Sequence, residues 1–73
     1  MQITTRTANA IRAAISGMEL RAGTLDALRA ESRLDGIVRD AGLWPEPTST
    51  GLIAQGREML RLHACSQLTR RAA

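Results

Sequence analysis

The chain has 73 residues, a formal net charge of +3 and an apolar fraction of 44%. This length allows one small domain, and the apolar fraction is typical of a folded chain, which argues against an extended disordered protein. All ten basic residues are arginine and Trp44 is the single aromatic residue, which excludes nucleic-acid modules that stack bases on several aromatic side chains.

The first segment of the chain carries apolar residues at the spacing of an α-helix. Its members are separated alternately by three and four positions: Ala8, Ile11, Ile15, Met18, Ala22 and Leu25. This spacing places them on one narrow face and predicts a helix over about 5–22, capped by one of the threonines within 4–7. Ser16 and Gly17 interrupt the pattern, but the apolar face continues beyond them, which favours a single helix.

A second segment repeats this spacing after Gly23-Thr24, which indicates a helix stop followed by a new N-cap. Its apolar members are Ala27, Ala30, Leu34, Ile37 and Ala41, with Val38 alongside. They predict a helix over about 25–41 that ends at Gly42, a residue suited to the left-handed backbone that follows many helices. Leu25 and Leu28 lie off this face, so they are available to the first helix or to a partner.

A linker with two prolines separates the second helix from the third. It spans about 42–49, and Pro45 and Pro47 exclude a continuous helix there. A third helix follows over about 50–69 and gathers its apolar side chains on one face: Leu52, Ile53, Gly56, Met59, Leu60, His63 and Ala64. No alternating run of β-branched residues predicts a sheet, and residues 2–5 could form at most one short strand.

These elements predict an all-α fold with one small three-helix domain over residues 1–73, in which a helical hairpin packs on a basic third helix. Alanine supplies twelve of the 32 apolar residues, so the core is thin. A chain this short gains little more from its core than it loses in ordering entropy. We therefore expect a homodimer packed through the apolar helical faces.

Trp44 in the linker has two interpretations. It can fill the core beneath the linker, where a large side chain is valuable in an aliphatic protein. It can also lie exposed and anchor an interface, since tryptophan is enriched at the centres of binding surfaces. Because this core has few large side chains, we expect Trp44 to be buried.

The sequence contains no arrangement typical of catalysis or of a bound metal or cofactor. His63 and Cys65 are two positions apart, so a helix points them in different directions, and no second pair of ligands accompanies them. The serines lack the context of an activated nucleophile, and the scattered glycines form no phosphate-binding loop. We therefore expect no enzyme, no metal site, no cofactor and no small-molecule substrate.

The composition also indicates a setting. No stretch of about 20 apolar residues could span a membrane, and the N-terminus lacks the apolar region of a signal peptide. The single Cys65 cannot form an internal disulfide, which favours a reducing, cytoplasmic environment without membrane contact. Abundant alanine and arginine without lysine, phenylalanine or tyrosine favour GC-rich codons, so we expect a bacterial or phage-encoded protein.

The best-defined features are the apolar helical faces, which favour a regulator or inhibitor that acts by binding another protein. The partner would present an apolar or acidic patch, because Arg57 and Arg61 of the third helix could steer such a partner. Further candidate contacts lie off the main apolar faces: Leu20, Leu25, Leu28, Leu62 and Trp44.

A dimeric DNA-binding regulator is the alternative function. In a helix-turn-helix protein the start of the third helix would enter the major groove, and the candidate contacts are Thr48, Thr50, Gln55, Arg57 and Arg61. The linker is longer than the usual turn and contains two prolines, which argues against this interpretation. In a ribbon-helix-helix protein, Gln2, Thr4 and Arg6 would alternate along an N-terminal strand.

Overall fold

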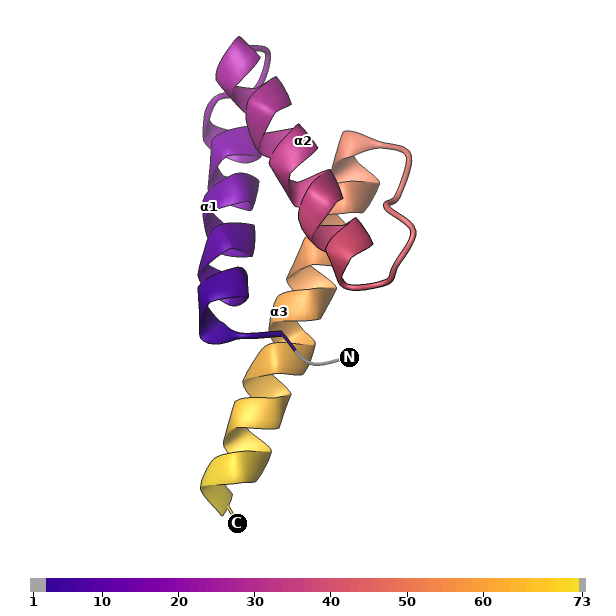
Figure 1. Ribbon diagram of the computed structural model, residues 1–73. Helices are drawn as coiled ribbons and strands as arrows, with labels where there is room; N and C mark the ends of the chain where they lie inside the picture. The colour runs from indigo at the N-terminus through magenta and orange to yellow at the C-terminus, as the bar shows by residue number, and fades with distance from the viewer. Residues whose placement is uncertain (1–2, 73) are drawn as a thin grey trace.

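The chain folds into three α-helices in the computed structural model, which describes residues 3–72, with the side chains of residues 3–68, and has no strand among them. Helix α1 spans Thr5–Leu20, α2 spans Leu25–Asp40 and α3 spans Ser49–Ala72. The first two helices form a hairpin, and α3 crosses this hairpin and continues past it (Figure 1). The predicted all-α fold with three helices is confirmed.

Three threonines cap the starts of the three helices, and those of the first two helices were predicted from the sequence. The Thr7 N–H donates to Thr4 Oγ1 at 3.1 Å, and the Ala27 N–H donates to Thr24 Oγ1 at 3.3 Å. At the start of α3, the Gly51 N–H donates to the hydroxyl of Thr48 at 3.0 Å. Each hydroxyl satisfies an amide that has no partner within its helix.

The helix ends differ slightly from those predicted. Helix α1 ends at Leu20 rather than near residue 22, because Gly23 has a φ of +82° and belongs to the turn before α2. Gly42, which was predicted to be left-handed, also has a φ of +82°. Helix α3 continues to Ala72 rather than ending near residue 69.

The short N-terminal strand is not present in the part of the chain that the structure describes. Helix α1 begins at Thr5, so Arg6 lies on a helix and Thr4 is its N-cap. Gln2 lies outside the described residues. The alternation of side chains expected in a ribbon-helix-helix protein is therefore wrong for Thr4 and Arg6.

The core lies between the three helices and is formed by most of the predicted apolar faces, whereas Ala22, Leu25 and Ala64, which were predicted to lie on those faces, are exposed. Its buried members are Ile11, Ala14, Ile15, Met18, Ala30, Leu34, Val38, Leu52 and Met59. Gly56 lets α3 approach closely, since a Cβ atom there would lie 3.1 Å from Ile15 Cδ1 and 3.4 Å from Leu34 Cδ1. One chain buries most of these faces by itself, and the expected homodimer stays a prediction.

Helix α3 is longer than the hairpin that it packs against. It has 24 residues, and Met59 is the last buried one of those with described side chains, after which Leu62 and Leu68 are exposed. The chain exposes 5064 Å², whereas a compact protein of 7.9 kDa exposes about 4,400 Å². No helix among the described residues is long and apolar enough to cross a membrane.

Candidate protein-binding surfaces

Two exposed leucines lie where the hairpin turns. Leu25 is the first residue of α2 and Leu28 lies one helical turn later, with exposed fractions of 60% and 62%. Residues three positions apart lie on the same side of a helix, so the two side chains are neighbours. They are exposed because the inward side of α2 is occupied by Ala30 and Leu34.

These two leucines border a hollow of about 400 Å³, which we call the turn hollow. Its walls come from all three helices and from the turn: Met18, Ala22, Gly23, Thr24, Leu25, Ala27, Leu28, Glu31, Ser49 and Ile53. Most of these side chains are apolar or small. Leu20 does not line it, so the structure brings Leu25 and Leu28 together and leaves Leu20 apart.

The turn hollow contains one carboxylate, that of Glu31. It accepts a hydrogen bond from the hydroxyl of Ser49, the first residue of α3. None of the ion pairs between described residues includes Glu31. The hollow therefore combines an apolar wall with a negative charge that is not neutralised by a neighbouring arginine.

A second hollow of about 590 Å³ lies between the linker and α3, and we call it the α3 groove. It is lined by Leu43, Glu46, Gly51, Ala54, Gln55, Glu58, Met59 and Leu62. Leu62 thus belongs to a different surface from Leu25 and Leu28. Of the candidate protein contacts chosen from the sequence, Leu25 and Leu28 line the turn hollow, Leu62 lines the α3 groove, and the others line neither.

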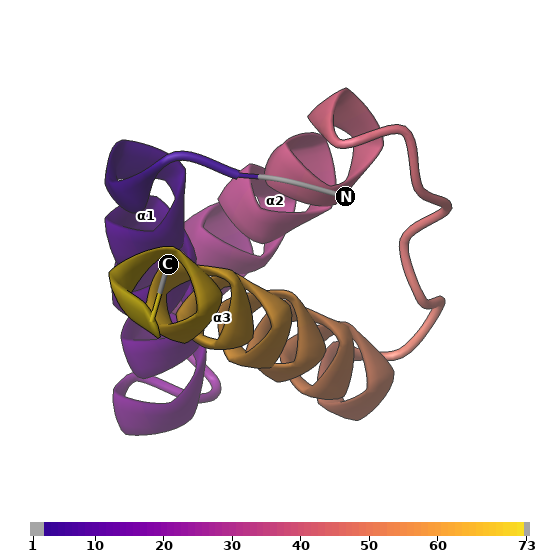
Figure 2. The ribbon, with the colours of Figure 1, turned by 90° about the horizontal axis from the view of Figure 1, so that it is seen from below.

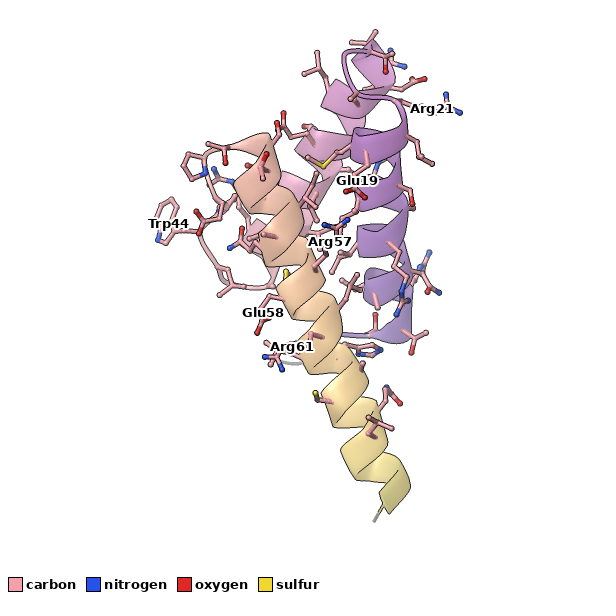
Figure 3. All side chains as sticks on the ribbon, turned by 180° about the vertical axis from the view of Figure 1, so that it is seen from behind. Glu19, Arg21, Trp44, Arg57, Glu58 and Arg61 are labelled. Carbon is pink, nitrogen blue, oxygen red and sulfur yellow. The ribbon has the colours of Figure 1, made fainter. Side chains whose placement is uncertain are left out.

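Trp44 is exposed to 84%, so the prediction that it fills the core is wrong. The linker is fastened to α3 through its backbone by the amide of Gln55, which donates to the Trp44 carbonyl at 2.8 Å and accepts from the Glu46 N–H at 2.9 Å. The linker arcs outward from the helices (Figure 2), and the Trp44 ring points away from α3 (Figure 3). Its ring centroid lies 5.9 Å from Cζ of Arg39 on α2.

Arg57 and Arg61, which were expected to contact a partner protein, form ion pairs with carboxylates of their own chain. Arg57 Nη2 lies 2.6 Å from Glu19 Oε2 on α1, and Arg61 Nε lies 2.9 Å from Glu58 Oε2 one turn earlier on α3 (Figure 3). The hydrogen bond from Arg61 lowers the pKa of Glu58, and the same bond raises the pKa of Arg61. A partner's acidic patch would have to compete with these internal carboxylates.

The residues assigned to DNA contact are also used within the chain. Thr48 caps α3, Gln55 holds the linker, and Arg57 and Arg61 are ion-paired. Thr50 is exposed. Four of the five side chains would have to leave an internal partner in order to contact a nucleic acid.

Sequence reasoning missed Ile53, Glu31 and Leu43 as parts of these surfaces. Ile53 follows the apolar spacing of α3 and was assigned to the core, but it is only half-buried. Glu31 belongs to a charged helix face that indicates solvent exposure. Leu43 could have been found because it stands next to Trp44 in a segment that is too short to bury both side chains.

The described residues contain no group of three or more histidine, cysteine or acidic side chains that could hold a metal ion. His63 is half-buried and Cys65 is exposed. Comparisons with protein-family models, with curated proteins and with solved structures found no significant match to this chain.

Proposed function

We propose that this chain is a non-enzymatic binding protein that acts on another protein through the turn hollow. The observation that carries the proposal is the exposure of Leu25 and Leu28, at 60% and 62%, beside an apolar hollow lined by all three helices. Adjacent apolar side chains that remain exposed around a hollow are typical of interaction sites. A protein of this kind regulates or inhibits its partner by occupying the partner's surface.

The occupant that fits best is an amphipathic helix of the partner. Its apolar side would place a leucine-sized side chain between Leu28 and Ile53, in the manner of other helices that bind in grooves. A lysine or arginine beside that side chain would pair with Glu31, whose carboxylate has no arginine partner among the described residues. Burying a fully exposed leucine contributes about 1.5–3 kcal/mol to binding. Leu25 and Leu28 are each a little over half exposed, so each would contribute part of that free energy.

Site-specific photo-crosslinking in the host cell identifies the partner and tests the surface. A crosslinking side chain at position 28 is expected to capture one protein that the same side chain at position 20 does not capture. Position 20 is the matched control, because Leu20 is an exposed leucine near the same turn that does not line the hollow.

The captured protein is then purified and its affinity is measured. Leu28→Asp should weaken binding at least about tenfold, and Leu20→Asp should leave it unchanged. Equal affinity for both variants, or equal capture from both positions, contradicts the proposal. Retention of duplex DNA that falls steeply with salt and is lost in Arg57→Ala supports the DNA-binding alternative instead.

A further inference from the structure

We propose that Trp44 and the α3 groove form one self-complementary surface, on which a second copy of this chain docks so that each Trp44 enters the groove of the other copy. This surface is separate from the turn hollow, since the two hollows share no lining residue. The proposal therefore does not depend on the proposed function. It rests on the shape of the groove, on the position of Trp44, and on the charges of this face.

The α3 groove offers an apolar site that its own tryptophan does not occupy. Its floor and walls include Met59, Leu62 and Leu43, whereas Trp44 is not among the lining residues. Gly51 and Ala54 keep one wall open because they have almost no side chain. A volume of about 590 Å³ lies within the range of about 300–1,000 Å³ for sites that enclose ligands larger than an indole ring.

The linker backbone next to Trp44 is held by α3. The two hydrogen bonds of Gln55 fix the backbone on both sides of Pro45, and the proline ring restricts the chain between them. A side chain on a backbone that is already held in place loses less entropy on binding than one on a mobile loop. Tryptophan also gives more binding energy than most residues when it enters a desolvated pocket.

A second copy is the occupant that these features favour. In a twofold dimer the same patch is used on both chains, so it must contain both the inserting side chain and its receptor. Trp44 and Leu43 are adjacent in the linker, and Gln55 both lines the groove and binds the Trp44 carbonyl. The linker–α3 face therefore contains both halves of such a contact.

The charges of this face agree with this arrangement. Arg39 lies beside Trp44 and pairs with Asp35 of its own helix through Nε at 2.8 Å, and it would accompany Trp44 toward the partner's groove, whose edge includes Glu46. The Glu46 carboxylate forms no ion pair among the described residues, so it is available to that arginine.

Sedimentation equilibrium and tryptophan fluorescence test the proposal together. Trp44 is the single tryptophan of a chain without tyrosine, so the emission reports on this side chain alone. With rising concentration the mass should double from 7.9 kDa, and the emission should shift to shorter wavelength at the same midpoint. Trp44→Ala and Leu62→Asp should each raise the dimer dissociation constant at least about 100-fold.

A mixture of the two variants provides the sharpest readout. Trp44→Ala keeps an intact groove and Leu62→Asp keeps an intact tryptophan. Only in the mixture can an intact tryptophan enter an intact groove, which restores one of the two contacts of the dimer. The emission of the mixture comes from Leu62→Asp, because Trp44→Ala has no tryptophan. This emission should shift to shorter wavelength in the mixture, whereas that of Leu62→Asp alone should not shift. Leu68→Asp is the matched control, because Leu68 is an exposed leucine on the same helix that does not line the groove, and this variant should dimerise like the parent chain.

Circular dichroism confirms that each variant retains its helices before it is compared. A chain that stays monomeric at millimolar concentration overturns the proposal. A dimer that persists in Trp44→Ala with unchanged affinity does so as well, since it must use another face. Masses that grow beyond the dimer contradict a reciprocal twofold contact.

Discussion

Arg57 of α3 binds Glu19 of α1 across 38 positions of sequence, with 2.6 Å between Nη2 and Oε2. This ion pair fastens α3 to the last turn of α1, close to where Gly56 lets the helices cross. Both side chains are about half exposed, at 58% and 44%, so water and salt screen their attraction. The pair therefore helps to hold α3 against α1, whereas the buried apolar side chains supply most of the stability of the fold.

Arg57→Ala should lower the free energy of unfolding by at most about 1 kcal/mol, because exposed ion pairs contribute little. The loss should shrink in high salt, and a double-mutant cycle with Glu19→Ala in urea unfolding should assign it to this pair. Arg33→Ala serves as the control, since Arg33 is exposed and no ion pair joins it to a described carboxylate. A salt-independent loss, or additive effects in the cycle, would contradict this assignment.

Gly56→Leu should destabilise the fold by about 1–3 kcal/mol. A Cβ atom at position 56 would already lie 3.1 Å from Ile15 Cδ1 and 3.3 Å from Ile11 Cγ2, so a larger side chain would push α3 away from the hairpin. Gly36→Ala is the matched control within α2, because nothing lies within 4 Å of the added atom, and it should stabilise by about 0.5–1 kcal/mol. Urea unfolding measures both, and a neutral Gly56→Leu would show that the crossing is loose.

Gln55→Ala should release the linker from α3. It removes the two hydrogen bonds to the Trp44 carbonyl and the Glu46 amide, at about 0.5–1.5 kcal/mol each. Fluorescence anisotropy of Trp44, measured at a concentration where the chain is monomeric, should fall because the linker becomes mobile. Gln67→Ala on the same helix should leave the anisotropy unchanged. If both variants behave alike, Gln55 does not hold the linker in solution.

The ion pair of Glu58 with Arg61 should make stability depend on pH in the acid range. The hydrogen bond from Arg61 lowers the pKa of Glu58 in the folded chain below its ordinary value of 4.5. A carboxyl whose pKa is lower in the folded state stabilises that state above the unfolded pKa, and this contribution is lost as the pH falls through the folded pKa.

Urea unfolding of the parent chain and of Glu58→Gln checks this sign. The parent should be the more stable of the two at pH 7, and the difference should disappear as the pH is lowered well below 4.5. Glu46→Gln provides the control, since the Glu46 carboxylate has no ion pair among the described residues. A difference that is constant with pH would show that Glu58 acts through packing rather than through charge.

The helices, their starts and most of the faces that they bury could be predicted from the amino-acid sequence. These features depend on signals within one turn of the chain, such as the Thr24 hydroxyl before α2, the left-handed Gly42, and apolar spacings of three and four. Such signals act between neighbouring residues, so they can be recognised without knowing how the helices cross.

The side chains that remain exposed for a partner could not be predicted in this way, because they depend on how the helices pack. Arg57 pairs with Glu19 because α3 crosses α1 near these two residues. They are 38 positions apart in the sequence, and no local sequence pattern predicts such a contact. Trp44 is exposed on a linker whose backbone is held by Gln55, eleven positions later in the chain. The helices are encoded by local backbone preferences, whereas the free surfaces are what remains after the helices have packed.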